Sequence, residues 1–234
     1  MDLSTTTAFV TGANRGLGRH FAQQLLAGGA TVYGGARNTD SIDIPGLIPV
    51  TIDVTDAASV AAAADTARGV SLLINNAGSF TGASFLDGPL DDIRLEMETH
   101  YFGTLAVARA FAPQLAAAGG GAVLNVLSVL SWVTFPTSGA YSAAKSAEWS
   151  LTNALRLELA AQGTLVTALH VGYMDTDMAA HVDAPKSDPA SVAKLALEAL
   201  QAGEIEILAD DVSRQVQAGL AGGAAALYPA LAAR

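Results

Sequence analysis

Short apolar runs alternate along this chain with longer stretches in which apolar residues recur at helical spacing. We expect the apolar runs to be strands, at residues 7–11, 31–36, 50–53, 71–75, 122–127, 165–170 and 205–208. We expect the periodic stretches to be helices, at residues 16–27, 56–67, 90–117, 141–162 and 191–202. Nearly continuous apolar strands between amphipathic helices are typical of a parallel sheet covered on both faces. The pattern therefore predicts an α/β fold with seven parallel strands, and a loop at residues 38–49.

The length of 234 residues suits a single domain. Hydrophobic residues make up 51% of the chain and charged residues 15%, which is enough apolar material for a large core. Neither an internal repeat nor a long linker divides the sequence, so we expect residues 1–234 to form one domain. Residues 219–234 are rich in alanine and glycine, and we expect them to be a flexible tail or to pack against a neighbouring subunit.

Acidic residues outnumber basic ones, and the formal net charge is −10. This charge disfavours nucleic acid and anionic membranes as partners. The uncharged stretch between Arg109 and Lys145 is interrupted by consecutive glycines and by Pro136, so we expect a helix end, a strand and a loop there rather than a membrane span. The N-terminal residues lack the basic region of a signal peptide, which favours a cytoplasmic protein.

The chain contains no cysteine, so neither a disulfide nor a thiolate metal site can form. His20, His170 and His181 are scattered without the spacing of metal ligands, and we therefore expect no metal site. Asp175 and Asp177 could be interpreted as a carboxylate pair, but we favour solvated loop residues as the interpretation.

Tyr141 and Lys145 are four residues apart in a predicted helix, so their side chains share one face of it. A phenol is a weak acid, and a nearby ammonium favours its ionised form, so Lys145 is expected to lower the pKa of Tyr141. Ser128 follows a predicted strand that ends beside this helix. Together they suggest a carbonyl site, in which Ser128 holds the oxygen and Tyr141 exchanges the proton. The alternative is a surface tyrosine and lysine at helical spacing.

A glycine-rich turn joins the first strand to the first helix. Glycines permit a tight turn and a close approach to phosphate, while the helix N-terminus attracts the anion. The second strand ends at Ala36 and Arg37 rather than at the carboxylate that would bind a ribose hydroxyl. Arg15 and Arg37 can converge on a 2′-phosphate, which favours NADP(H) over NAD(H); the alternative is two solvated arginines. The turn residues expected to bind the cofactor are Gly12, Asn14, Arg15, Gly16, Leu17 and Gly18.

These motifs occur in the order found in the short-chain dehydrogenase/reductase family, which this sequence resembles from about residue 6 to residue 208. They comprise the turn at residues 11–18, Asp53-Val54, the Asn-Asn-Ala-Gly run at 75–78, Ser128, and the Tyr141/Lys145 pair. The resemblance implies a doubly wound Rossmann-type domain and an NADP(H)-dependent carbonyl reductase. It also implies further cofactor contacts, which include Tyr141 and Lys145 themselves. The others are Asp53 and Val54 at the adenine, Asn75, Ala77 and Gly78 along the cofactor, and Gly172, Met174 and Thr176 near the nicotinamide.

Two positions depart from the family pattern. Counting on from Gly78, His100 occupies the place where the family has an asparagine that relays protons to the lysine. A histidine can donate and accept, so His100 is a candidate catalytic residue; the alternative is a histidine that only packs between helices. Val171-Gly172 replaces the family's Pro-Gly, which loosens a turn beside the nicotinamide while keeping its glycine.

The expected activity is reversible NADPH-dependent reduction of a ketone or aldehyde to the alcohol. The first alternative is an NADP(H)-binding regulatory or scaffold protein in which His100 weakens turnover. A cofactor-independent lyase or dehalogenase on the same fold is disfavoured by the intact glycine turn and by Lys145.

Three segments around Ser128 and Tyr141 are expected to form the substrate pocket, with a mobile flap from Tyr173 to about Pro189. These segments contain no arginine or lysine before Lys186, so an uncharged hydrophobic ketone fits best. The alternative is that several of these side chains belong to the core or to a subunit contact. The expected pocket residues are Phe80, Leu130, Trp132, Phe135, Tyr173 and Met178.

The helices at residues 90–117 and 141–162 carry apolar side chains on more than one face. A monomer would leave some of this surface in water, and members of the family commonly pair these helices. We therefore expect a homodimer or homotetramer. The residues concerned are Leu105, Val107, Phe111, Trp149, Leu151, Leu155 and Leu159.

Overall fold

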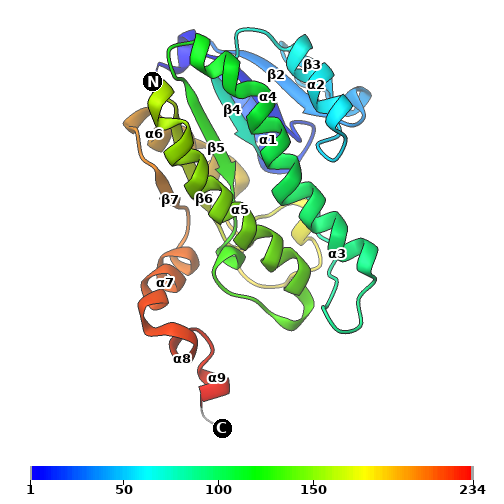
Figure 1. Cartoon of the computed structure of the whole chain (residues 1–234), viewed down its shortest axis with the longest axis vertical. Helices are drawn as coiled ribbons and strands as arrows, with labels where there is room; N and C mark the ends of the chain where they lie inside the picture. The colour runs from blue at the N-terminus through cyan, green and yellow to red at the C-terminus, as the bar shows by residue number, and fades with distance from the viewer. Residues whose placement is uncertain (1, 233–234) are drawn as a thin grey trace.

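The structure, a computed structural model, describes residues 2–232 and contains one seven-stranded sheet. All neighbouring strands pair in parallel, in the order β3-β2-β1-β4-β5-β6-β7 (Figure 1). The order reverses between β1 and β4, and ligands of such sheets bind at the carboxyl ends of the strands flanking that point. The predicted α/β fold with a seven-stranded parallel sheet is confirmed. The strands are β1 (Thr7–Thr11), β2 (Thr31–Ala36), β3 (Ile48–Thr51), β4 (Leu72–Asn75), β5 (Ala122–Val126), β6 (Leu165–His170) and β7 (Glu206–Leu208).

Helices cover both faces of the sheet because alternate strand residues point to opposite sides. In β1, Ala8 and Val10 pack with the core on one side, whereas Phe9 packs with the core on the other. The first core includes residues of α1 (Gly16–Ala27) and α6 (Pro189–Ala202). The second includes residues of α2 (Ala57–Thr66), α4 (Thr104–Ala117) and α5 (Gly139–Glu158). Within residues 2–232, the structure contains no helix with the length and apolar character needed to cross a membrane.

The third strand begins earlier than predicted, at Ile48 rather than at residue 50, and includes Pro49. β3 lies at the edge of the sheet, where one side of the backbone has no partner strand. A proline lacks an N–H group and is tolerated at such an edge. The prediction of a loop up to residue 49 was therefore wrong at its end.

The predicted helix at residues 90–117 is interrupted. α3 (Leu90–Met97) is followed by a π-helical turn at Glu98–Gly103, and α4 begins at Thr104. Turns of this kind often occur at functional sites because the extra residue re-aims the side chains around it. This turn contains His100, which is buried.

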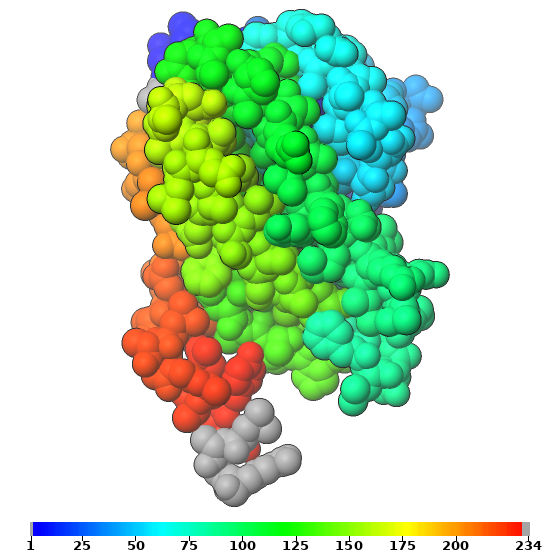
Figure 2. Space-filling view, in the orientation of Figure 1, coloured from blue at the N-terminus to red at the C-terminus, as the bar shows by residue number. Residues whose placement is uncertain are grey.

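Within residues 211–232 the C-terminal segment forms three short α-helices, α7 (Asp211–Gly219), α8 (Gly223–Leu227) and α9 (Pro229–Ala232). In Figure 2 this segment extends from one end of the molecule and lies beside the part of the chain that follows β5. The backbone N–H of Thr134 donates to the Tyr228 hydroxyl at 2.9 Å. The predicted tail therefore makes a contact within its own subunit; residues 233–234 lie outside the described part of the chain.

Candidate active site

The glycine-rich turn after β1 has the geometry of an anion-binding loop. Gly12 and Gly16 have positive φ angles of 68° and 51°, which residues with a Cβ rarely adopt. A Cβ at Gly18 would lie 2.2 Å from the Gly12 carbonyl oxygen, so the helix can approach this closely only with glycine there. Arg15 precedes α1 without a side-chain cap, which leaves the first helical N–H groups available to a phosphate.

Thr11 and Asn76 tie this turn to the end of β4. The Thr11 hydroxyl accepts from the backbone N–H groups of Asn76 and Ala77 at 2.9 and 3.0 Å. The Asn76 amide donates to the Thr11 carbonyl oxygen at 2.9 Å. Asn75 has a different role, because its amide donates to the Asn125 side chain on β5 at 2.8 Å. The predicted run at residues 75–78 thus joins the turn to the sheet, chiefly through Asn76.

Arg37, exposed after β2, lies near Asp53 after β3. Hydrogen bonds from the Thr55 hydroxyl and N–H lower the pKa of Asp53, and the Arg37 charge lowers it further. Asn14 of the turn donates to the Ser41 hydroxyl at 3.1 Å, which joins the turn to the segment after Arg37.

Arg15 has a partner that the sequence did not indicate. Its guanidinium lies 3.9 Å from the Asp177 carboxylate, and both side chains are exposed. Asp177 follows Thr176, whose methyl group lies 3.4 Å from the position that a Cβ at Gly16 would occupy. The flap after β6 therefore lies against the glycine-rich turn.

One hydrogen bond attaches the start of the flap to the rest of the fold, and further contacts join the two ends of the flap to each other. The backbone N–H of Gly172 donates to the Asp210 carboxylate at 2.6 Å. Met174 is bridged to Ser187, and the backbone N–H of Ser187 donates to the Tyr173 carbonyl oxygen at 2.8 Å. Between these contacts Met178, one of the expected pocket residues, is exposed.

Ser128, Tyr141 and Lys145 meet at the carboxyl end of β5. Ser128 follows the strand, and its hydroxyl accepts from the backbone N–H of Leu130 at 3.1 Å, which fixes the turn that leads towards α5. The Lys145 ammonium lies 5.8 Å from the centre of the Tyr141 ring. The structure therefore brings together the three side chains that the sequence predicted to form a carbonyl site.

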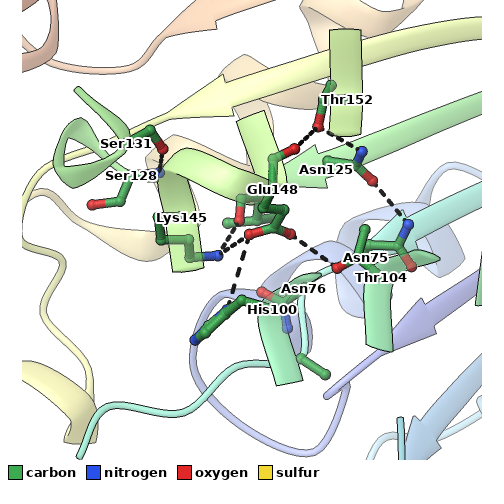
Figure 3. Close-up of polar contacts among 12 residues, drawn as sticks. Asn75, Asn76, His100, Thr104, Asn125, Ser128, Ser131, Lys145, Glu148 and Thr152 are labelled. Carbon is green, nitrogen blue, oxygen red and sulfur yellow. Dashed lines mark hydrogen bonds and ion pairs between the residues drawn. The ribbon is translucent and has the colours of Figure 1, made fainter. Parts of the chain in front are cut away.

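Lys145 is buried and bound on two sides. Its ammonium donates to the Val126 carbonyl oxygen at 2.8 Å and to the Glu148 carboxylate at 2.7 Å (Figure 3). Burial alone would lower the pKa of Lys145, but the Glu148 charge raises it above its ordinary value. Glu148, itself buried, was not among the predicted site residues. It lies one helical turn after Lys145 on the same face, and a carboxylate at this spacing was the available signal.

The predicted direction of the Tyr141 pKa shift was wrong. Burial raises the pKa of the phenol above its ordinary value, and the opposing effect of Lys145 is smaller. Glu148 raises the pKa of Tyr141 further, whereas the Ser128 hydroxyl lowers it. Lys145 lowers the pKa of Tyr141 as predicted, but the Glu148 carboxylate beside it offsets part of this effect.

His100 contacts groups from three elements. Its Nε2 atom lies 2.9 Å from the Ser79 carbonyl oxygen and 3.3 Å from the Glu96 carboxylate. Its Nδ1 atom lies 3.9 Å from the Glu148 carboxylate and is buried without a hydrogen-bond partner. The ring also meets Tyr141 edge-on, with centroids 5.1 Å apart. His100 therefore lies between the catalytic side chains and a second buried carboxylate, which the sequence analysis missed.

Glu96 is fully buried and is held by several donors. The Ser79 hydroxyl donates to it at 2.9 Å, and the backbone N–H of Thr81 donates to its other oxygen. Burial favours a raised pKa, but the bonds from His100, Thr81 and Ser79 together lower the pKa of Glu96 below its ordinary value. The carboxylate thereby fixes the loop after Gly78.

The expected substrate-pocket residues differ in their burial and in their contacts. Phe80 meets Tyr141 edge-on with centroids 5.4 Å apart, and Leu130 is buried in a small cluster that Tyr141 joins. Phe135 and Tyr173 are about half exposed, as residues at a rim would be. Trp132 packs on other rings, those of His170 and Trp149.

His181, from the flap, is a site neighbour that the sequence analysis did not predict. Its ring is stacked on that of Phe80, with centroids 6.1 Å apart. No local pattern marks this residue, because its contact depends on how the flap folds back over the loop after β4.

A family model described as short chain dehydrogenase matches residues 6–187. The chain is 33% identical over 176 residues to the NADPH-dependent 1-acyldihydroxyacetone phosphate reductase of Schizosaccharomyces pombe; the match covers 71% of this chain and 59% of that protein's length. It is 31% identical over 214 residues to an uncharacterized oxidoreductase of Staphylococcus aureus strain N315, a match that covers 85% of this chain and 92% of that protein.

Two solved structures resemble the whole fold. A short chain dehydrogenase from Burkholderia cenocepacia J2315, in complex with NADP, has a TM-score of 0.94 and 38% sequence identity, with 99% of each chain covered. A short-chain dehydrogenase from Streptomyces avermitilis has a TM-score of 0.86 and 26% identity, with 100% of this chain and 98% of that chain covered.

Proposed function

Because this chain belongs to the short-chain dehydrogenase family, a family of oxidoreductases, we propose that it is an NADPH-dependent reductase of uncharged, hydrophobic ketones or aldehydes. The observation that carries the proposal is that Ser128, Tyr141 and Lys145 lie together beside Phe80. They lie at the carboxyl ends of the strands, where the glycine-rich turn also lies. The same site would oxidise the corresponding alcohol in the reverse direction.

The residues present fit a dinucleotide carrying a 2′-phosphate. The uncapped N-terminus of α1 suits the pyrophosphate, and the exposed Arg37 and Arg15 suit the additional phosphate. The similarity to a structure in complex with NADP and to an NADPH-dependent reductase supports this choice. Asp53 and Val54 would lie at the adenine, and Asn75, Ala77, Gly78, Gly172, Met174 and Thr176 along the rest of the cofactor. When bound, NADPH supplies the hydride.

The protein's own part in the reaction is to position the carbonyl and to deliver a proton. Ser128 would hold the carbonyl oxygen, and Tyr141 would donate its phenolic proton to that oxygen as negative charge develops there. Lys145 would stabilise the resulting phenolate. The raised pKa of Tyr141 suits this direction, because the phenol remains protonated and ready to donate at neutral pH.

The pocket walls support an uncharged substrate. Phe80 and Leu130 are apolar, and residues 79–88, 129–139 and 172–185 contain no arginine or lysine. The named substrate of the S. pombe relative combines an acyl chain with a phosphate. In this chain the acyl part would find apolar contacts, but the phosphate would have no arginine or lysine as a partner in these segments.

Turnover of matched substrates tests the proposal. The purified protein would be incubated with NADPH and either an aryl alkyl ketone or a keto acid of similar size, and cofactor oxidation would be followed by absorbance. We expect kcat/KM to favour the ketone by at least about 10-fold, since an unpaired buried carboxylate costs more than about 1.4 kcal/mol. A preference for the keto acid would refute the apolar pocket. NADPH binding without turnover of any carbonyl would instead indicate a regulatory or scaffold protein.

We also propose that the protein forms a dimer or a tetramer through α4 and α5. Val107, Phe111, Leu151, Leu155 and Leu159 are buried within the subunit, so they contribute to the core rather than to an interface. The surface that remains for pairing includes the partly exposed Leu105 and Trp149, and the exposed Phe102 and Leu157.

A further inference from the structure

Glu148 forms a buried ion pair with Lys145 directly beside the candidate proton donor. The exposed fraction of Glu148 is 2% and that of Lys145 is 4%. One carboxylate oxygen accepts from the Lys145 ammonium at 2.7 Å, and the other accepts from the Thr104 hydroxyl at 3.0 Å (Figure 3). Both oxygens therefore act as acceptors, which is the arrangement expected of an ionised carboxylate.

The surroundings of Lys145 show that Glu148 is the charged group that acts on it most strongly. Of the other titratable groups that face this pair, His100 comes from the π-helical turn, with Nδ1 3.9 Å from the Glu148 carboxylate, and Tyr141 comes from α5 itself. Glu96 of α3 lies behind His100, and His170 of β6 lies on the other side of Ser128. Within residues 2–232, Glu148 is the only residue whose side chain accepts a hydrogen bond from the ammonium.

A negative charge at Glu148 makes it harder for Tyr141 and Lys145 to lose their protons. Lys145 and Tyr141 interact closely, so they lose protons as a coupled pair rather than as separate groups. Whichever of the two gives up the first proton, a buried carboxylate beside them makes that loss more costly. Removing the charge must therefore move the first deprotonation of the pair to lower pH.

We propose that Glu148 is a positioning residue, which holds Lys145 in place and sets the upper pH limit at which the Tyr141–Lys145 pair can deliver a proton. The role of Glu148 in ketone reduction rests on the proposed function. The effect of its charge on the protonation of Tyr141 and Lys145 does not. Ketone reduction needs both members of the pair in their protonated forms. Glu148 thus extends reduction to higher pH, while the Thr104 hydroxyl keeps the carboxylate in place and the Val126 carbonyl oxygen holds the ammonium.

Glu148→Gln tests this inference because it removes the charge and keeps the shape and the acceptor for Lys145. We expect the alkaline limb of the pH profile of kcat/KM for ketone reduction to move to lower pH by at least about one unit. The KM for the ketone should change little, since Glu148 is not in the apolar wall. A second readout needs no turnover: the pH titration of tyrosinate absorbance, with the Tyr141→Phe protein subtracted, should show ionisation shifted in the same direction.

Two control variants separate the charge from other effects. Glu148→Asp keeps a carboxylate and should leave the alkaline limb near its wild-type position, even if kcat falls. Glu158→Gln removes the same charge from the same helix at an exposed site, and should leave the whole profile unchanged. Should Glu148→Gln fail to fold, Glu148→Met, which keeps the side-chain length without charge, carries the same expected shift.

The outcomes distinguish this inference from the proposed function. An active wild-type enzyme with an unshifted limb and an unshifted tyrosinate titration in Glu148→Gln would overturn the role of Glu148 alone. An equal shift in Glu158→Gln would also overturn it, because a general charge effect would then explain the result. A wild-type protein without carbonyl turnover, but with a shifted tyrosinate titration in Glu148→Gln, would refute the proposed function and support the charge effect of Glu148.

Discussion

The indole ring of Trp132 stacks on the imidazole ring of His170, with ring centroids 3.9 Å apart and planes 18° from parallel. The Nδ1 atom of His170 lies 3.3 Å from the carbonyl oxygen of Ser128. Trp149 meets Trp132 edge-on from α5. The stack therefore supports the backbone on which the Ser128 hydroxyl depends, at the point where β5 and β6 end side by side.

His170 makes the stability of the protein depend on pH. Burial lowers the pKa of His170 from 6.5 to about 4, and the charges of Arg156 and Lys145 act in the same direction. The hydrogen bond to Ser128 and the Glu206 carboxylate, 3.3 Å from Nε2, oppose this shift without reversing it. Between these pH values the unfolded chain binds a proton that the folded chain excludes, so stability rises with pH. The contribution of His170 to the free energy of unfolding is complete above pH 6.5 and is lost as the pH falls towards 4. It amounts to about 3 kcal/mol at most.

Urea unfolding at several pH values would measure this effect. The His170→Gln variant retains a polar side chain that cannot gain a proton, so its free energy of unfolding should fall less between pH 6.5 and pH 4 than that of the wild type. Parallel curves for the two proteins would contradict the assignment to His170.

Replacing Tyr141 with phenylalanine removes the proposed proton donor while preserving the ring that contacts Phe80 and His100. We expect kcat to fall by about 10²–10⁴-fold, the usual contribution of general acid catalysis. The Kd for NADPH, measured by fluorescence, should stay close to the wild-type value. Near-normal turnover in Tyr141→Phe would exclude this residue as the donor.

Arg37→Asp should reverse the choice of cofactor. The substitution removes a cation from the proposed 2′-phosphate site and introduces a second carboxylate near Asp53. Loss of one charge-assisted contact should weaken NADPH binding by about 1.5–3 kcal/mol and affect NADH much less. Arg68→Asp, an exposed change just after α2, serves as the control and should alter neither Kd. A wild-type preference for NADH would show that the arginine interpretation is incorrect.

His100 gives a prediction that separates a proton relay from simple packing. If it occupies the relay position, His100→Asn should preserve or raise kcat, because an amide still donates and accepts, whereas His100→Ala should lower it. Steady-state kinetics of the three proteins would decide. Equal kcat values in all of them would mean that protons do not pass through this residue.

Gly78→Ala probes the same position by steric means. An added Cβ would lie 2.8 Å from Cε1 of His100, so the ring must move. We expect a lower melting temperature and a lower kcat. Combining Gly78→Ala with His100→Asn, whose side chain is smaller, should restore part of the melting temperature and part of kcat. A loss in the double variant equal to the sum of the single losses would show that the two residues do not interact.

The proposed pairing through α4 and α5 is checked by light scattering. At micromolar concentration we expect the mass of at least a dimer, because exposed Phe102 and Leu157 would otherwise remain in water. Replacing Leu157 with glutamate should shift the mass towards that of the monomer. A monomeric wild-type protein would contradict the proposal.

The sequence by itself determined the features that depend on local interactions. Apolar runs specify strands buried on both faces, so β1 and β2 have the bounds that the pattern predicted. The glycines of the first turn are required by backbone geometry, which makes Gly12 and Gly16 identifiable without the fold. Tyr141 and Lys145 are related by one helical turn, and helical spacing is readable in a single sequence.

The tertiary structure alone decided the electrostatics of the candidate site. The π-helical turn at Glu98–Gly103 points His100 towards Glu148 and Glu96. The spacing of apolar residues in the sequence did not predict this interruption of the helix. Burial, together with the Glu148 charge, raised the pKa of Tyr141 where the spacing of Tyr141 and Lys145 had predicted a lowered one. A pKa depends on every charge and every desolvating atom nearby, and residues far apart in the sequence supply these only once the chain has folded.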